Sequence, residues 1–390
     1  MTVKLYDTDS YLWEFDCKVI SLYNDEDYIY IETDRTAFFP EGGGQTCDKG
    51  SFNGINVENI QITDSKIVHF VKNSEENADF FKIGTVLHGK IDMKKRFSDM
   101  QQHSGEHIFS GIVNSLYGYN NVGFHLGSEV VTLDFDGELN EDDVCKVENL
   151  VNEAIWKNLE IKITLPSQEE LANIKYRSKI EIEGQVRIVE IPGVDVCACC
   201  APHVKRTGEI GIVRVVNFER YKGGTRVSIL CGERALLDLR HKLKQNRLVS
   251  NLTSSKQDET AAAVERLKNE NDKLKYDLIG MTRDFLTLKS ENIAPKERIV
   301  IFDEKLQGKL LQDFALSLMD KAGKFAACFC CENGSYRYCI VSKQVNLQGL
   351  AKALNSEFSG RGGGKPQIVQ GSLTAGYEKE IADFLDSFEI

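Results

Sequence analysis

Alternating apolar and polar residues dominate the first ninety positions of the chain. Residues 27–33, 66–73 and 85–92 show the two-residue period of half-buried strands. Between the first two runs, residues 34–50 contain a proline and a row of three glycines, which is typical of a loop. We therefore predict a mostly β domain at residues 1–92 with a glycine-rich loop inside it.

The pattern then changes to a mixture of helix and strand over residues 93–235. Residues 98–118 predict a helix, with Ser98 as its N-cap and Gly118 at its end. Residues 141–158 carry apolar side chains every three or four positions, and Ser167 with Glu170 has the spacing of a capping box. Apolar runs that predict strands lie at residues 129–135, 185–191, 210–216 and 225–232.

A long helical segment is predicted from about residue 232 to residue 292, within a third region at 236–295. Its second half repeats apolar residues every seven positions. The a positions are Val264, Asn271, Leu278 and Phe285, and the d positions are Leu267, Leu274, Met281 and Leu288. This repeat is typical of a coiled coil, in which a polar Asn at an a position fixes the register. A helical hairpin packed on its own chain would show the same stripe, and the repeat leaves both arrangements open.

The last region, residues 296–390, alternates helical and strand patterns and predicts a compact α/β domain. Helices are expected at residues 309–323 and 347–358, and strands at 324–331 and 337–343. A glycine-rich stretch at 359–372 and a closing helix follow. The chain as a whole is therefore predicted to be an α+β protein of several domains.

Composition places the chain among soluble globular proteins. It has 390 residues, 42% hydrophobic and 27% charged, and no run of apolar residues long enough to span a membrane. The first twenty residues lack the apolar stretch of a signal peptide. Eleven scattered cysteines argue against a secreted disulfide framework, so we expect a cytoplasmic protein with reduced thiols.

A net charge of −11 argues against a surface coated for nucleic acid, but it leaves room for local basic patches. One candidate patch holds Lys94, Lys95 and Arg96. The other spans residues 205–226 and holds Lys205, Arg206, Arg214, Arg220, Lys222 and Arg226. Ordinary solvated strand faces would show the same charges.

Two short motifs have the spacing of metal ligands. The sequence HSGEH places His103 and His107 four residues apart on a predicted helix, so both imidazoles leave the same face. The sequence CCAPH places Cys199 and His203 four residues apart, and Pro202 favours a loop there. Together they would supply three nitrogens and one sulfur, a set that suits Zn²⁺ better than Mg²⁺ or Ca²⁺. Cys197 and Cys200 lie close by and have no assigned role.

The same HSGEH motif also matches the H-x-x-E-H pattern of inverted zinc metallopeptidases. In that interpretation His103 and His107 bind zinc and Glu106 activates water. It leaves the glycine-rich loop and the CCAPH motif without roles.

Two glycine-rich stretches are candidates for close contact with a ligand. Gly42, Gly43, Gly44 and Gln45 lack the strand-to-helix setting of a nucleotide-binding loop, but glycines let backbone amides approach an anionic group. The stretch from Gly360 to Lys365 adds two cations, Arg361 and Lys365, and suits phosphate contacts. Plain surface turns would have the same composition.

The order of these motifs resembles the alanyl-tRNA editing proteins called AlaX, which are free-standing relatives of the editing domain of alanyl-tRNA synthetase. The resemblance rests on TAFFPEGGGQ, HSGEH and the Cys–His pair followed by TGEIG, and it covers nearly the whole chain. It implies a translation-factor-like β-barrel at 1–92, a zinc-containing editing domain at 93–235 and, after the helical region at 236–295, a DHH-associated domain at 296–390.

The family resemblance also implies residue roles. It gives one zinc ion per chain the ligands His103, His107, Cys199 and His203. It places Thr36 at the amino-acid pocket and His125 in its lining, while Glu106 is a candidate base. This chain departs from the usual family pattern between the Cys and His ligands, where it has Cys200, Ala201 and Pro202, and at Phe39, where a Tyr is usual.

The activity implied by this resemblance is hydrolysis of the ester in tRNA(Ala) wrongly charged with serine or glycine. A homodimer through the C-terminal helical and α/β region is implied as well. The alternatives are a zinc metallopeptidase and a non-enzymatic tRNA-binding protein with a structural zinc.

Overall fold

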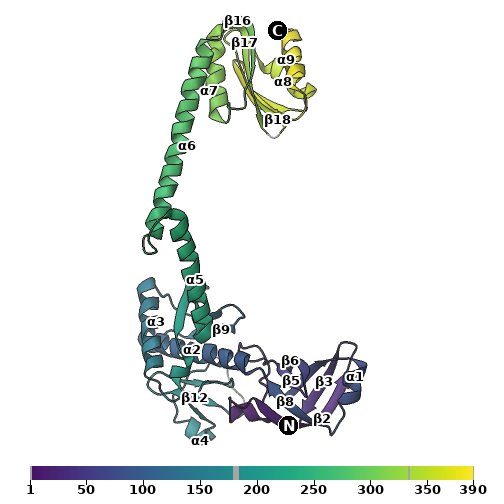
Figure 1. The fold of residues 1–390 in the computed structure, drawn as a ribbon, viewed down its shortest axis with the longest axis vertical. Helices are drawn as coiled ribbons and strands as arrows, with labels where there is room; N and C mark the ends of the chain where they lie inside the picture. The colour runs from purple at the N-terminus through teal and green to yellow at the C-terminus, as the bar shows by residue number, and fades with distance from the viewer. Residues whose placement is uncertain (1, 179–183, 333, 390) are drawn as a thin grey trace. The chain divides into compact units, whose positions relative to one another are not determined.

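A computed structural model describes residues 2–178, 184–332 and 334–389. It divides the chain into two compact units, Met1–Arg247 and Leu248–Ile390 (Figure 1). The expected α+β character is confirmed, because both units combine helices with sheets. The finer division into four domains stays a prediction. Within the described ranges, no helix has the length and apolar character needed to cross a membrane.

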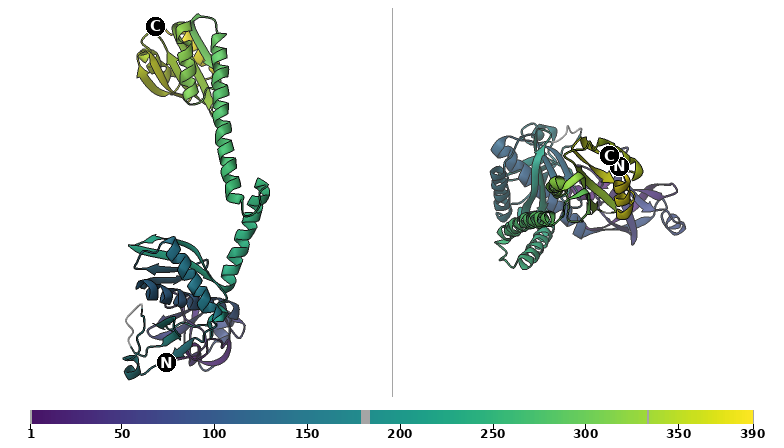
Figure 2. Two further views of the ribbon diagram at one scale, coloured as in Figure 1. Left: turned by 90° about the vertical axis from the view of Figure 1, so that its left-hand side faces the viewer. Right: turned by 90° about the horizontal axis from the view of Figure 1, so that it is seen from above.

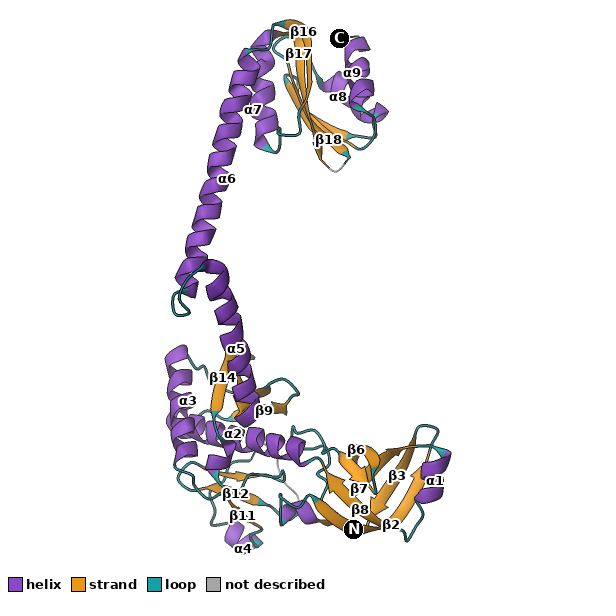
Figure 3. Ribbon diagram, viewed as in Figure 1, coloured by secondary structure: helices purple, strands orange, loops and turns teal. Residues whose placement is uncertain are grey.

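The first unit begins with a closed barrel of six strands, and the strands predicted in this part of the sequence are confirmed. The barrel strands run in the order β2 (Glu14–Asn24), β3 (Tyr28–Thr33), β7 (Lys66–Lys72), β6 (Ile55–Thr63), β5 (Gly50–Phe52) and β8 (Val86–Ile91) (Figure 3). Alternate side chains, among them Ile31, Phe52 and Ile60, fill its core. The likeness to a translation-factor barrel stays a prediction.

Three short elements accompany the barrel. The strand β1 (Val3–Lys4) pairs in parallel with β4 (Arg35–Thr36), which opens the glycine-rich loop. The 3-10 helix η1 (Leu5–Asp7) follows β1, and the short helix α1 (Glu75–Phe80) follows β7. The pairing of β1 with β4 fixes the start of the loop against the N-terminal segment.

The helix α2 (Met93–Tyr117) follows the barrel in the chain and runs through the remainder of the first unit (Figure 1). The prediction that Ser98 caps this helix is wrong. Asp92 is the N-cap, because its carboxylate accepts a hydrogen bond from the backbone N–H of Lys95 at 3.1 Å. The predicted end is confirmed, since Gly118 takes the left-handed conformation of a helix C-cap at φ 74°. Starting five residues earlier places Arg96 inside the helix.

Two further sheets complete the first unit and surround α2. One has the order β14 (Val213–Tyr221), β15 (Gly224–Cys231), β10 (Val131–Phe135) and β9 (Asn121–Leu126); the other has β11 (Lys162–Thr164), β12 (Ile188–Ile191) and β13 (Asp195–Ala198). The helices α3 (Glu141–Trp156) and α4 (Gln168–Leu171) both start with capping boxes, and η2 (Thr207–Ile210) follows the Cys–His loop. One apolar core joins α2, α3 and the strands.

The predicted long helical segment from 232 to 292 is helical over most of its length but is not one continuous helix. The structure has two helices, α5 (Gly232–Thr253) and α6 (Thr260–Glu291). Ser254 takes a positive φ of 50°, and the backbone N–H of Ser255 turns back to the carbonyl of Ser250. The polar residues of this connection have no apolar face to bury, so nothing favours helix there.

The second unit is a five-stranded sheet covered by helices on both faces (Figure 2). The strand order is β16 (Lys296–Phe302), β17 (Ala322–Glu332), β18 (Ser335–Val341), β20 (Ile368–Leu373) and β19 (Arg361–Lys365). The helix α7 (Lys309–Leu318), which η3 (Met319–Lys321) extends, packs on one face together with Leu286 of α6. The helices α8 (Gln348–Glu357) and α9 (Glu378–Ser387) cover the other face.

The glycine-rich stretch at 360–365 is an edge strand, β19, and the alternative that it is a simple surface turn is wrong. Gly362 of this strand and Gly371 of the neighbouring β20 are needed because other groups come very close to them. A Cβ on Gly362 would lie 2.6 Å from the hydroxyl oxygen of Tyr338, and a Cβ on Gly371 would lie 2.4 Å from the carbonyl oxygen of Arg361.

Candidate metal centre

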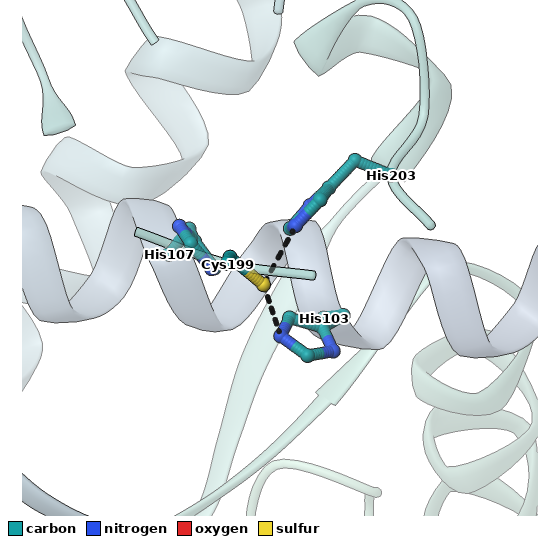
Figure 4. A group of neighbouring side chains, drawn as sticks. All are labelled: His103, His107, Cys199 and His203. Carbon is teal, nitrogen blue, oxygen red and sulfur yellow. Dashed lines mark hydrogen bonds between the residues drawn. The ribbon is translucent and has the colours of Figure 1, made fainter. Parts of the chain in front are cut away.

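Four side chains predicted as metal ligands converge in the first unit (Figure 4). His103 and His107 project from α2, and Cys199 and His203 come from the loop after β13. Their donor atoms all lie within 4.8 Å of one another, and the three histidines are buried. The thiol sulfur of Cys199 lies 3.4 Å from the Nε2 atoms of both His103 and His203.

Local backbone contacts hold the Cys–His loop in place. β13 ends at Ala198, and the backbone N–H of Cys199 donates to the carbonyl of Arg187 at 3.0 Å. The guanidinium of Arg187 donates in return from Nη1 to the carbonyls of Cys199 and Ala201, at 2.8 and 2.9 Å. A buried arginine therefore fixes the turn that carries the thiol.

Each histidine of the cluster is oriented by a hydrogen bond at its other ring nitrogen. The Nδ1 atom of His103 lies 2.8 Å from Oε1 of Gln45, that of His107 lies 3.1 Å from a carboxylate oxygen of Asp195, and that of His203 lies 3.0 Å from the hydroxyl of Ser104. These bonds leave all three Nε2 atoms for the centre of the cluster. Partners of this kind typically orient metal-binding histidines.

The spacing of the donor atoms fits a single tetrahedral metal ion. Ligand bonds of about 2.0–2.1 Å to nitrogen and about 2.3 Å to sulfur, at a tetrahedral angle, place N and S roughly 3.5 Å apart. The two N–S distances of 3.4 Å match this value. The packing of the chain by itself gives the donor atoms this spacing. Three nitrogens and one sulfur are a suitable donor set for a borderline-soft cation.

The protonation states of Cys199 and His203 favour a cation. Burial alone would raise the pKa of Cys199, but the nearby His103 and His203, with hydrogen bonds from His103 and His107, lower that pKa well below its usual value. Burial lowers the pKa of His203 to about 3, so this imidazole is neutral. A thiolate and a neutral imidazole are the forms that bind metal. Burial would lower the pKa of His107, but its hydrogen bonds with Asp195 and Cys199 raise that pKa well above its usual value, so His107 must release a proton to bind a metal.

Glu106 lies beside the cluster, and its carboxylate is hydrogen-bonded by two residues that are not part of the cluster. Its Oε1 atom accepts hydrogen bonds of 2.7 Å from both Ser110 and Asn121, and its other oxygen lies 3.9 Å from Nε2 of His107. In the metallopeptidase interpretation Glu106 would activate a water at an open metal position. Because Cys199 and His203 complete a set of four protein donors, this arrangement disfavours the peptidase alternative.

The remaining cysteines of the motif differ in position. Cys197 is buried and forms a second close group with His107 and Asp195, while Cys200 is exposed. Asp195 is already engaged by His107 and by Arg177, whose Nε and Nη2 donate to it at 2.7 and 2.9 Å. Cys199 is therefore the thiol that faces all three histidines.

The glycine-rich loop docks against β9 and brings Gln45 to the cluster. Gly44 has a φ of 81°, and a Cβ there would lie 2.5 Å from the carbonyl oxygen of Phe124. The ring of Phe124 lies 4.8 Å from that of His103. The contributions of Asp195, Ser104 and Phe124 were not found from the sequence. Ser104 lies inside HSGEH and Asp195 lies four residues before Cys199, but ligand spacing does not tell which side chain binds the outer nitrogen of each histidine.

Two predicted pocket residues lie outside the four-residue cluster. Thr36 is fully buried in the barrel, where its hydroxyl lies 2.9 Å from Nε2 of His69 and accepts the backbone N–H of Phe38 at 3.2 Å. Since Nδ1 of His69 bonds the carbonyl of Ile31 at 3.0 Å, Nε2 accepts the Thr36 proton. His125 is exposed on β9. The roles of Thr36 and His125 stay predictions.

Most of the predicted basic patches are neutralised. Arg96 is fully buried against Asp48, and Lys95 bonds Asp99 at 2.6 Å. Within residues 205–226, four cations pair with carboxylates: Lys205 with Asp9, Arg214 with Glu148, Arg220 with Glu138 and Arg226 with Asp134. These pairings favour the alternative that the charges belong to ordinary solvated strand faces.

Arg361 and Lys365, the two cations of the glycine-rich strand, are exposed on β19 in the second unit. Arg361 lines a groove of about 540 Å³ together with Arg337, Ser335, Ser372, Gly371 and Glu332. Arg337, Ser372 and Arg361 are directly paired across three neighbouring strands, so their side chains share one face of the sheet.

Comparisons with known proteins agree with the motif order. Residues 186–228 match the family described as "Threonyl and Alanyl tRNA synthetase second additional domain", and residues 296–389 match the DHHA1 domain. The alanyl-tRNA editing protein AlaX-L of Pyrococcus horikoshii is 29% identical, over 98% of this chain and 97% of its own length. The predicted resemblance to this family is therefore confirmed.

Two other relatives differ in the fraction of their own length that aligns with this chain. The alanyl-tRNA editing protein Aarsd1 of Danio rerio is 27% identical over 74% of this chain and 73% of its own. The alanine–tRNA ligase of Pyrococcus furiosus is 28% identical over 95% of this chain, which spans 42% of that enzyme. The C-Ala domain of Aquifex aeolicus alanyl-tRNA synthetase is 17% identical, covers 24% of this chain and 91% of its own, and has a TM-score of 0.22, too low to support a structural argument.

Proposed function

We propose that this protein is a trans-editing hydrolase that deacylates tRNA(Ala) charged with the wrong amino acid, chiefly serine and also glycine, at a site holding one zinc ion. Similarity to an editing protein along nearly the whole chain supports the reaction class. The convergence of His103, His107, Cys199 and His203 supports the zinc.

The observation that carries this proposal is the position of Gln45. Its Oε1 orients His103, and its amide nitrogen is buried with no hydrogen-bond partner among the described residues. A buried N–H without a partner is costly, so a ligand that accepts from it gains affinity. Gln45 thus offers a donor beside the metal ligands, suited to an ester carbonyl or to the hydroxyl of serine.

Hydrolysis of an aminoacyl ester requires little from the protein beyond positioning of the reacting groups. An aminoacyl ester is already activated, so a held water and donors placed where negative charge develops are sufficient to speed its hydrolysis. Zinc bound by the four protein ligands would act as a Lewis acid on an oxygen of the substrate or of water only by accepting that oxygen as a fifth ligand. Gly42, Gly43 and Gly44 let the backbone approach the substrate closely. Glu106, the candidate base, has a carboxylate oxygen 3.9 Å from Nε2 of His107.

Discrimination against correctly charged tRNA would come from the serine hydroxyl. A site that hydrogen-bonds this hydroxyl rejects alanine strongly, because alanine leaves buried polar groups of the site unpaired. Gln45 and Thr36 are the candidates for this contact, and His125 lines the approach. The proton of Thr36 already goes to His69, so its hydroxyl would act as an acceptor.

Contacts with the body of the tRNA are assigned to the second unit. Arg361 and Lys365 on the exposed strand β19, with Arg337 beside them in the groove, provide positive charge for backbone phosphates. This assignment suits a chain whose net charge of −11 confines phosphate binding to local sites.

A homodimer through α6 completes the proposal. Its heptad positions are exposed in the single chain, including Leu274 at 67%, Leu278 at 65% and Met281 at 71%. The stripe continues into a groove of about 730 Å³ that α6 forms with residues 304–310. A contiguous apolar stripe of this kind is normally covered, and a second copy of the same helix matches its period.

Deacylation of seryl-, glycyl- and alanyl-tRNA(Ala), each with and without a chelator, tests this function. We expect rapid loss of serine, slow loss of alanine and no activity once the metal is removed. Full activity in the metal-free protein would overturn the role of zinc. Cleavage of peptides instead would support the peptidase alternative, and tRNA binding without ester hydrolysis would support the non-enzymatic one.

A further inference from the structure

Arg96 is a fully buried cation that takes no part in the cluster yet connects to both of its loops. It lies on α2, seven residues before His103, so the two side chains leave the same side of the helix about two turns apart. Its partner is Asp48, which is also buried. Asp48 follows Gln45 by three residues in the glycine-rich loop.

Two parallel connections therefore join one helix to one loop. His103 meets Gln45 at 2.8 Å, and Arg96 donates from Nε to Asp48 at 2.8 Å and again from Nη2. Lys95 adds a bond to the carbonyl of Cys47 at 2.9 Å. The orientation of the Gln45 amide thus depends on a loop that Arg96 and its neighbour hold against α2.

The same guanidinium also reaches the loop of His203. Its Nη1 atom donates to the carbonyl of Ser10 at 3.0 Å, and the hydroxyl of Ser10 donates to the carbonyl of His203 at 2.8 Å. Its Nη2 atom donates to the carbonyl of Ala37 at 2.7 Å, at the start of the glycine-rich segment. Asp48 in turn accepts the backbone N–H of Phe39 at 2.5 Å.

We propose that Arg96, paired with Asp48, is a positioning residue of the metal centre. It fixes the 45–48 loop and, through Ser10, the loop of His203 onto the helix that carries His103 and His107. Only a planar guanidinium offers donors in the directions of a carboxylate and two carbonyls at once. This inference rests on the proposed metal centre and extends it to a residue that touches neither metal nor substrate.

The test measures zinc affinity of the full-length protein by competition with a chelator, and the ligand-field spectrum of its cobalt form. Arg96→Met should weaken zinc binding by about 10–100-fold, the usual effect of losing an outer partner of a metal ligand. It should also change the cobalt spectrum, because His203 and His103 lose their fixed orientation. Arg96→Lys, which keeps the charge but not the fork, should fall between Arg96→Met and the wild type.

A matched control separates positioning from general loss of stability. Ile29→Ala removes buried apolar volume from the barrel core and should leave zinc affinity and the cobalt spectrum unchanged. If Arg96→Met fails to fold, the double variant Arg96→Met with Asp48→Leu removes both buried charges and should fold while still binding zinc weakly. Wild-type affinity and spectrum in either folded variant would overturn the proposal.

The outcome is independent of the activity assay, because only zinc, cobalt and chelator are used. A protein that hydrolyses no aminoacyl-tRNA but loses zinc affinity on Arg96→Met would contradict the proposed function and support the positioning role. Normal deacylation by the wild-type protein, together with unchanged zinc affinity in Arg96→Met, would support the proposed function and contradict the positioning role.

Discussion

At the scale of single residues, the metal centre depends on which nitrogen and which sulfur face inward. Three different partners, Gln45, Asp195 and Ser104, bind the outer nitrogens of the histidines. The departure of this chain from the usual Cys–His spacer leaves Cys199 in place, because Arg187 holds the backbone on both sides of it.

The thiols of this loop give a sharp mutational prediction. Cys199→Ala should abolish both zinc binding and deacylation, since it removes the sulfur that faces all three histidines. Cys200→Ala, its exposed neighbour, should keep both. Elemental analysis of the metal content and measurement of deacylation rates test both variants. If Cys200→Ala lost the metal and Cys199→Ala kept it, the ligand assignment would be wrong by one position.

His69 predicts how stability responds to acid. Burial lowers the pKa of His69 from about 6.5 to about 4. Between these values the unfolded chain binds a proton that the folded chain does not, so the free energy of unfolding falls as the pH falls. The slope is about 1.4 kcal/mol per pH unit, or about 3 kcal/mol in total.

Chemical denaturation from pH 7 to pH 4 measures this effect. His69→Gln keeps a hydrogen-bonding side chain but cannot titrate, so its stability should fall less steeply than that of the wild type over the same range. All other titrating groups are common to both proteins. Parallel curves would show that His69 takes up its proton without unfolding.

At the scale of elements, α2 is the part on which the first unit is organised. It carries two of the four proposed metal ligands, the buried Arg96 and the Glu106 carboxylate, and it packs against strands of both smaller sheets. By contrast, α6 carries its apolar side chains on an exposed stripe. The first helix is covered by its own chain, and the second is available to a partner.

Substitutions on α6 test the proposed dimer. Leu274→Glu places a charge at a d position and should convert the dimer to a monomer, because two buried charges would face each other. Tyr276→Glu, at the outer f position and 77% exposed, should leave the dimer intact. Sedimentation equilibrium distinguishes the two, and a monomeric wild-type protein would contradict the assignment.

At the scale of the whole molecule, acidic residues outnumber basic ones. The chain carries a net charge of −11, and four cations of the 205–226 patch, Lys205, Arg214, Arg220 and Arg226, are paired with carboxylates. Binding of a long polyanion must then rely on a small number of phosphate contacts, which makes each of them visible in the salt dependence.

The salt dependence of tRNA binding provides the corresponding prediction. Replacing both Arg361 and Lys365 with Ala should weaken binding to all tRNAs and reduce the slope of log K against log salt by about 2, roughly one for each lost contact. Lys379→Ala, an exposed cation on α9, should leave the slope unchanged. An identical slope in the double variant would remove β19 from the binding surface.

The sequence by itself determined those features that depend on neighbouring residues. Strand alternation, the capping box at Ser167 and the four-residue spacing within each ligand pair all act over a few positions, so the local pattern predicts them. The order of motifs along the chain was sufficient to predict the family resemblance.

Only the tertiary structure decided how distant segments meet. It placed Asp195, Ser104 and Gln45 behind the three histidines, and it buried Arg96 where the sequence suggested a surface cation. It also ended α5 at Thr253, where local polarity and a positive φ stop the helix. Contacts between residues 50 to 100 positions apart depend on the packing of whole sheets and helices, and no local period records that packing.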